Sequence, residues 1–285
     1  MKPGIYTQSD KSYHSEDGAE VPMLSASIIK VLLAHSPLHA WDCHPKLNPS
    51  YVSEEKEVFD LGVTAHALML QGLEIATVFQ FEDWRKTDAR KARDEARAAG
   101  KTPILAKHWA RVKAMVEAGK RQIAEHKEIA GCFEGGTAET TIVWFDTEFQ
   151  IYCKGRIDYL HQPNRRLLDY KGTGTSVNPE SIAKFAISQG WDVQSSFYLR
   201  GIKQLTGDDY DFVFVAQEDY EPYALTAVGM GPDFLWNGRS KVERAMSIWA
   251  ECMRTGRWSG YPDRIVYPIL PAWEEARSVE KELAL

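Results

Sequence analysis

Residues 167–176, LLDYKGTGTS, place a carboxylate and an ammonium two positions apart at the end of an apolar segment. A β-strand sends alternate side chains to opposite faces, so Asp169 and Lys171 would share one face while Leu168 and Tyr170 point into a core. A carboxylate beside a lysine can bind a hard cation or stabilise charge on a phosphate. The spacing therefore predicts a polar site where the strand ends.

A second carboxylate lies on the preceding predicted strand, 149–160, FQIYCKGRIDYL. If the linker HQPNR forms a tight hairpin turn, Asp158 lies directly opposite Asp169, and opposed side chains share a face about 4.5–5.5 Å apart. Two carboxylates that close repel each other unless a cation lies between them, and Mg²⁺ prefers carboxylate oxygens. From the hairpin alone, a surface hairpin whose acids pair with Lys154 and Arg156 is an equally good interpretation.

The rest of the chain supplies elements that could position this hairpin. Alternating or continuous apolar segments predict strands at 137–145, 149–160, 166–171, 211–217 and 223–228. Apolar periodicity with capping residues predicts helices within 25–41, 55–71, 83–126 (broken near Gly100 and Pro103), 178–205 (interrupted at Gly190) and 232–254. We therefore expect an α/β fold, with a mixed central sheet flanked by helices and an N-terminal helical part.

Composition excludes several protein classes. The chain has 285 residues, 44% hydrophobic and 26% charged, which is typical of a globular protein. Because it has no apolar run of about 20 residues and no signal-peptide pattern, we expect a cytoplasmic protein with no membrane partner. The four cysteines form no CxxC pair, which favours reduced thiols over a zinc ribbon or a disulfide framework. The net charge of −6 means that a nucleic-acid partner has to be argued from the site.

The order of the polar motifs resembles that of a known nuclease group. Asp158 followed by Asp169-Tyr170-Lys171 resembles the core pattern of the PD-(D/E)xK nuclease superfamily, which has a restriction-endonuclease-like core. GVTAH at 62–66, GRID at 155–158 and QSSFY at 194–198 resemble, in the same order, the GxxxH, GxxD and QxxxY motifs of its RecB-type branch.

Longer segments are similar to one subgroup, the RecE-like phage and prophage exodeoxyribonucleases. These segments are LSASIIKVLLAHSPLHAW, FDLGVTAHALML, WDVQSSFYLRGI and GRWSGY, and the likeness spans about residues 4–274. The resemblance implies one nuclease domain over residues 1–285. Its parts would be a mainly helical segment, 1–130, a catalytic sheet core, 131–230, and a C-terminal helical segment, 231–285.

The resemblance also implies a role for each motif residue. The metal ligands would be His66, Asp158, Asp169 and the backbone carbonyl of Tyr170, holding Mg²⁺, which Mn²⁺ could replace. Lys171 would be the catalytic lysine beside the two aspartates. Gln194 and Tyr198 would support Lys171 or contact DNA. Glu139 lies where many relatives have an additional acid.

The implied activity is Mg²⁺-dependent digestion of linear double-stranded DNA, 5′→3′, leaving a single strand for an annealing protein in recombination. Relatives form toroidal homo-oligomers, so we expect a ring that receives duplex ends. The alternatives are a structure-specific or single-strand endonuclease on the same core, and a non-catalytic module that binds DNA ends.

Two features permit a plainer interpretation. His66 follows Gly62 by four residues on one predicted helix face, where the glycine could let the helix approach the sheet closely, but a lone histidine there is more often part of a core. The basic residues of 85–97 are interleaved with acids, which is typical of a solvated helix face; the alternative is an arm that contacts DNA.

Overall fold

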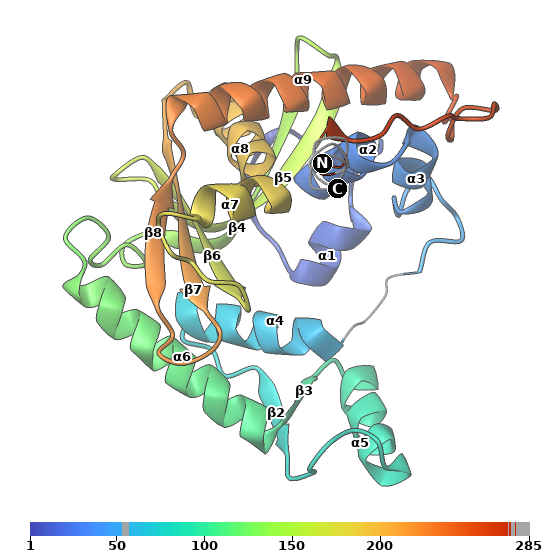
Figure 1. Cartoon of the computed structure of the whole chain (residues 1–285). Helices are drawn as coiled ribbons and strands as arrows, with labels where there is room; N and C mark the ends of the chain where they lie inside the picture. The colour runs from blue at the N-terminus through green and yellow to red at the C-terminus, as the bar shows by residue number, and fades with distance from the viewer. Residues whose placement is uncertain (53–56, 273, 275–276, 278–285) are drawn as a thin grey trace, which may run out of the picture.

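A mixed six-stranded sheet forms the centre of the protein (Figure 1). The computed structural model describes residues 1–52, 57–272, 274 and 277. The sheet has the order β1-β4-β5-β6-β7-β8, in which β6 and β7 are parallel and the other neighbours are antiparallel. Its strands are β1 (Gly4–Thr7), β4 (Thr137–Asp146), β5 (Ile151–His161), β6 (Arg166–Thr173), β7 (Asp211–Glu218) and β8 (Leu225–Gly229).

Helices cover both faces of this sheet (Figure 1). One face packs against α2 (Ala26–Ala34), α8 (Trp191–Thr206) and α9 (Pro232–Thr255), and the other against α4 (Glu57–Leu70) and α6 (Ala106–Glu125). The remaining elements are α1 (Asp10–Ser15), α3 (Pro37–Asp42), α5 (Thr87–Ala98), α7 (Ile182–Gln189) and a small parallel sheet of β2 (Ala76–Phe79) and β3 (Thr102–Leu105).

The two cores follow from the alternation of the strands. Leu167 of β6 packs into the core under α2, α8 and α9, whereas its neighbours Leu168 and Tyr170 pack into the core under α4 and α6. The regular two-residue alternation breaks in β5, where Ile157 and Leu160, three residues apart, both enter the first core. This irregular stretch of the sheet contains Asp158.

Most of the predicted elements are present. The α/β class with a mixed sheet flanked by helices is confirmed, Ser25 caps α2 by accepting from the amide of Ile28, and α9 starts at Pro232. The start expected at residues 55–56 lies outside the described residues. Of the cysteines, Cys43 is half-buried and the other three are buried, and all four are free. None of the helices in the described ranges combines the length and apolar character needed to cross a membrane.

The segment 83–126 was predicted wrongly in part. It contains not only the helices α5 and α6 but also strand β3, in which Pro103 lies opposite Thr77 of β2. The short strands β1, β2 and β3 each have four residues, too few for a periodic pattern to identify them. The three-part division of residues 1–285 remains a prediction.

The close approach expected at Gly62 is also wrong. Gly62 is exposed on α4, and a Cβ added there would meet nothing within 4 Å. The close approach between helices occurs instead at Gly238 of α9, where an added Cβ would lie 2.0 Å from the backbone oxygen of Asp192 in α8.

These two helical glycines give a matched test of the packing. Gly238→Ala should lower the free energy of unfolding by about 1–3 kcal/mol or more, because the methyl group would force α9 away from α8. Gly62→Ala should raise it by about 0.5–1 kcal/mol, because alanine is the better helix former and has open space here. Chemical denaturation measures both; equal effects of the two substitutions would contradict the described packing.

Candidate active site

Three carboxylates lie side by side on three neighbouring strands. The ladders pair Ala138 of β4 with Tyr159 of β5, and Tyr159 with Leu168 of β6. The adjoining positions on β4, β5 and β6 hold Glu139, Asp158 and Asp169. The backbone ladders do not pair these three residues with one another. The register therefore places the two aspartates on opposing positions, as the hairpin argument expected, and adds Glu139 to the same row.

His66 of α4 bridges two of these acids. Its Nε2 lies 2.7 Å from Asp158 Oδ2, and its Nδ1 lies 2.9 Å from Glu139 Oε1. Burial by itself lowers the pKa of the imidazole, but the two carboxylates outweigh burial and raise the pKa to about 10. His66 is therefore protonated, and its two ring nitrogens donate to Asp158 and Glu139. The imidazolium supplies the positive charge between these two carboxylates.

Asp158 is further held by the neighbouring strand. Its Oδ2 accepts a 2.9 Å hydrogen bond from the backbone amide of Tyr170, the residue between Asp169 and Lys171. Burial raises the pKa of this carboxyl, but the charge and hydrogen bond of His66 outweigh burial, and the pKa is lowered. Asp158 is therefore ionised in this arrangement. The Tyr170 side chain points into the core, where its hydroxyl donates to Gln217.

Asp169 is the most deeply buried acid of the row, with 1% of its side chain exposed. Burial, and next the charge of Asp158, raise its pKa to about 6. Lys171 opposes this shift, because its Nζ lies 2.6 Å from Asp169 Oδ1. Burial lowers the pKa of Lys171, but the two aspartates outweigh it and raise the pKa, so the lysine stays protonated.

Helix α8 brings the two remaining motif residues to the sheet. Gln194 Nε2 donates to Asp169 Oδ2, so Gln194 reaches Lys171 through this shared carboxylate. The Tyr198 ring lies against Gly155, where an added Cβ would come within 2.9 Å of it, and its hydroxyl accepts a 3.4 Å bond from the amide of Arg156. The glycine of GRID thus makes room for the tyrosine of QSSFY.

Arg156 is a functional candidate that the sequence argument treated only as an ion-pair partner of the hairpin. Its guanidinium bonds Glu139 through Nε, lies 3.5 Å from Asp10 of α1 and covers the Tyr13 ring. Glu139 itself has a left-handed backbone, with φ of 54°, which is uncommon for a residue with a side chain. The signal available in the sequence was the alternation of β5, which could have paired Arg156 with an acid on β4.

The candidate metal ligands around Glu139, Asp158 and Asp169 do not converge on one metal position. In the described ranges, no group of three or more His, Cys, Asp or Glu side chains is arranged to hold a metal ion. The carboxylates instead face the cations His66, Lys171 and Arg156. Asp169 Oδ1 is nevertheless a buried oxygen that makes no hydrogen bond of normal geometry, although Lys171 Nζ is close to it. The donors, carboxylate oxygens and an imidazole, have the chemistry that a divalent cation requires.

The basic residues of α5 and the preceding loop interact with nearby acids. Arg85 lies 3.7 Å from Asp83, and Lys91 lies 3.8 Å from Glu95 one turn later. Such pairing is typical of a solvated helix face, the plainer of the two interpretations. A role of segment 85–97 in DNA contact stays a prediction.

Comparison with known families now bears on this geometry. A family model described as a PDDEXK-like domain of unknown function (DUF3799) matches residues 25–269. The chain belongs to this family. The resemblance to the PD-(D/E)xK superfamily is thereby confirmed, and membership supports a nuclease. PDDEXK-like nucleases generally use divalent metals, which agrees with the donor types of the row.

Solved structures add support for the fold of this PDDEXK-like domain. A candidate exonuclease from Eubacterium rectale superimposes with a TM-score of 0.62 over 95% of this chain and 98% of that chain, at 14% sequence identity. A structure described as SSO0001 covers 68% of this chain and 87% of that chain at 10% identity, but its TM-score of 0.29 is too low to support the fold. None of the curated proteins compared with the chain matches it.

The raised pKa of Asp169 predicts a pH-dependent gain from Asp169→Asn. The carboxyl of Asp169 keeps its proton up to about pH 6 in the folded state but only to about pH 3.8 in the unfolded state. As pH rises between these values, the free energy of unfolding therefore falls by roughly 3 kcal/mol. Asparagine does not ionise. The melting temperature of the variant relative to the unsubstituted protein should therefore increase from pH 4 to pH 7.5 in a chelator. A difference that is constant with pH would contradict the raised pKa.

Proposed function

We propose that the protein is a Mg²⁺-dependent exodeoxyribonuclease that digests linear double-stranded DNA from its ends. The observation that supports this most is the placement of Asp158 and Asp169 on neighbouring strands with Lys171 Nζ 2.6 Å from Asp169, in a chain of the PDDEXK-like family. Carboxylates beside a lysine provide what phosphodiester hydrolysis requires: negative ligands for a divalent ion and a positive donor for the phosphate.

The residues that would hold Mg²⁺, or Mn²⁺ in its place, are Asp158, Asp169, His66 and the backbone carbonyl of Tyr170. When bound, the ion supplies Lewis-acid stabilisation of the charge that develops on the scissile phosphate. The imidazole of His66 must give up the proton on one ring nitrogen to become a ligand, because a nitrogen that donates to Asp158 has no free lone pair.

The other side chains orient this centre. Lys171 would place the attacking water beside Asp169 and, once it has given up its own proton, activate that water, while Gln194 keeps the second oxygen of Asp169 fixed. Tyr198 would hold α8 against Gly155 so that Gln194 stays in reach. Arg156 fixes Glu139, which in turn fixes the ring of His66. Gln194, Tyr198, Arg156 and Glu139 would therefore position the metal ligands, whereas Lys171 would act on the water.

Two parts of the proposal, the need for a DNA end and the partners, are argued from similarity to other proteins. The E. rectale protein, described as a candidate exonuclease, aligns over nearly the whole of both chains, which supports an exonuclease over another nuclease type. By the RecE-like resemblance, digestion would run 5′→3′ in the cytoplasm and leave single strands for an annealing protein in recombination. A ring of identical subunits would let an acidic chain present a channel to DNA.

A time course on two substrates tests the proposal. With Mg²⁺, an end-labelled linear duplex should be digested progressively, whereas a covalently closed circle of the same sequence should stay intact, because it offers no end. Digestion should weaken with salt, since phosphate contacts release counterions. The linear duplex is made by cutting the same circle once, so that the two substrates have the same sequence and length.

Two results would overturn the exonuclease. Nicking or linearisation of the closed circle at a rate matching the linear duplex would favour the endonuclease on the same core. Binding of duplex ends without cleavage in Mg²⁺ or Mn²⁺ would favour the non-catalytic module.

A further inference from the structure

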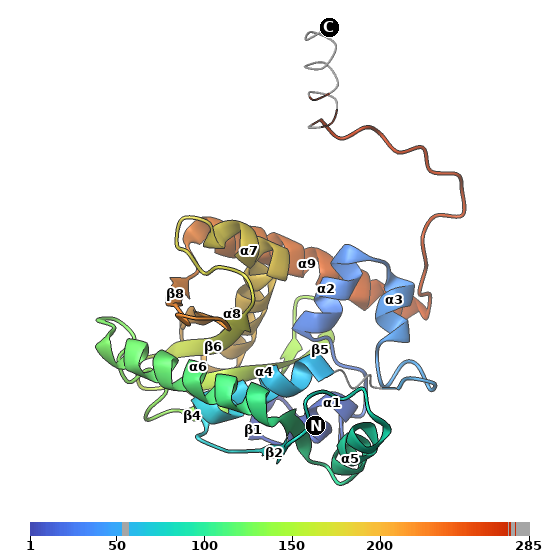
Figure 2. The same ribbon diagram turned by 60° about the horizontal axis from the view of Figure 1, so that its bottom comes forward.

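A lysine outside the nuclease motifs reaches toward the candidate active site. Lys30 is a half-buried residue of α2, which lies on the same side of the sheet as α7 and α8, opposite α4 and α6 (Figure 2). Its Nζ donates a 2.8 Å hydrogen bond to the backbone oxygen of Gln189, the last residue of α7. The long side chain therefore crosses from α2 to the junction between α7 and α8.

The junction between α7 and α8 leaves room for this side chain. Gly190 joins the two helices with a left-handed backbone, φ 66°, a conformation that favours glycine. A Cβ added to Gly190 would lie 2.9 Å from Lys30 Cε, closer than two carbon atoms can normally pack. The missing side chain at position 190 is therefore what allows Lys30 to pass along the junction.

One helical turn separates this junction from the acidic row. The backbone amide of Gln194 donates to the backbone oxygen of Gly190, so the two residues are about 6 Å apart along the axis of α8. Helical side chains lean toward the N-terminus of their helix, so the Gln194 amide, which donates to Asp169, leans toward the end where Lys30 is held. The ammonium of Lys30 therefore lies beside the pair of Asp169 and Lys171.

The charge of Lys30 has no carboxylate of its own. In the part of the chain that the structure describes, no Asp or Glu oxygen lies within ion-pair distance of its Nζ, which bonds a neutral carbonyl instead. The two nearby acids are engaged elsewhere, Asp169 by Lys171 at 2.6 Å and the fully buried Asp192 by Lys241 at 2.7 Å. Burial, and next the charge of Lys171, lower the pKa of Lys30, and the two acids offset this only in part.

A bound anion would relieve this arrangement. Two ammonium groups that lie close together repel each other, and burial adds to the cost of keeping both charged. A tie between α2 and α7 would need only a neutral donor to the Gln189 oxygen, so the positive charge of Lys30 exceeds what packing requires. Phosphate oxygens are the anions that DNA brings to a protein surface, and lysine is a frequent donor to them.

We propose that Lys30 binds the phosphate next to the scissile one in the DNA strand that is cleaved. The proposal rests on the proposed nuclease function and names a further group that holds its substrate. Because Lys30 is anchored about one turn of α8 away from the carboxylates, the neighbouring phosphate is its target and the scissile one is left to Lys171. An ammonium has three N–H donors, so the bond to Gln189 leaves two for phosphate oxygens.

The salt dependence of DNA binding tests this contact. A fluorescent linear duplex is titrated with the full chain in a chelator at several salt concentrations, and each phosphate contact adds about 0.9 to the slope of log K against log salt. Lys30→Gln, which can still donate to Gln189, should weaken binding about tenfold and lower the slope by about 0.9. Lys30→Met should do the same, whereas Lys30→Arg should keep both values.

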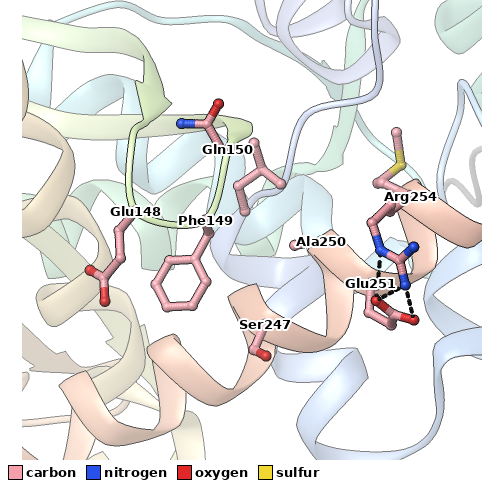
Figure 3. A pocket seen from close by; sticks show the side chains of 9 residues that line it. Glu148, Phe149, Gln150, Ser247, Ala250, Glu251 and Arg254 are labelled. Atoms are coloured by element: carbon pink, nitrogen blue, oxygen red, sulfur yellow. Dashed lines mark hydrogen bonds and ion pairs between the residues drawn. The ribbon is translucent and has the colours of Figure 1, made fainter.

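The matched control removes a positive charge that already has a partner. Arg254 is paired with Glu251 at 2.7 Å in a groove beside α9 (Figure 3), so Arg254→Met should leave the slope unchanged. Melting temperatures confirm that each variant is folded. An unchanged slope in Lys30→Gln and Lys30→Met, or an equal fall in Arg254→Met, would overturn the contact.

Uncharged linkages then identify the phosphate. Linear duplexes that carry one methylphosphonate at successive positions are compared in binding and, with Mg²⁺, in single-turnover cleavage by the unsubstituted protein and Lys30→Gln. The linkage next to the scissile one should weaken binding and cleavage by the unsubstituted protein but add nothing to the loss in Lys30→Gln. Additive losses at every position, or coupling at the scissile linkage alone, would refute the assignment. If the unsubstituted protein binds the duplex but never cleaves it, the nuclease is overturned, whereas the slope and the coupling in binding still decide whether Lys30 contacts a phosphate.

Discussion

Repulsion among three carboxylates on neighbouring strands is the constraint to which the rest of the site responds. Glu139, Asp158 and Asp169 lie in one row, and a sheet brings opposed side chains to about 5 Å. Such a row is stable only if cations neutralise it. His66 and Lys171 do so here, with 2.7 Å and 2.6 Å contacts to the two aspartates.

The two helical layers each serve this row from one side. Helix α4 carries the imidazole to Asp158 and Glu139, and the core under α4 and α6 fixes that helix against β6 through Leu168 and Tyr170. Helix α8 brings the side-chain amide of Gln194 to Asp169. This helix can pack close to β5 because Gly155 has no side chain where the Tyr198 ring lies. The pKa values of the two aspartates shift in opposite directions, because the charge and hydrogen bond of His66 outweigh burial at Asp158, whereas burial and the charge of Asp158 outweigh Lys171 at Asp169.

Sequence predicted the parts of this arrangement that depend on local pattern. A tight turn in the linker HQPNR was sufficient to oppose Asp158 and Asp169, and the order of motifs was sufficient to predict the superfamily. The left-handed backbone of Glu139 could not be predicted, because a non-glycine residue takes it only where the surrounding fold imposes it. The four-residue strands were missed since pairing, not propensity, defines them. Gly62 and Gly238 had no local signal to distinguish open space from helix contact.

The central claim is that Asp158 binds the ion while Lys171 acts on the reacting groups. Calorimetric titration with Mg²⁺, paired with single-turnover cleavage of a linear duplex, measures it in two variants. Asp158→Asn should lose both metal binding and cleavage, whereas Lys171→Met should lose cleavage by about 10²-fold or more and keep metal binding, because an ammonium is not a ligand. Retention of Mg²⁺-dependent cleavage by Asp158→Asn, or equal loss of metal in both variants, would contradict this division of roles.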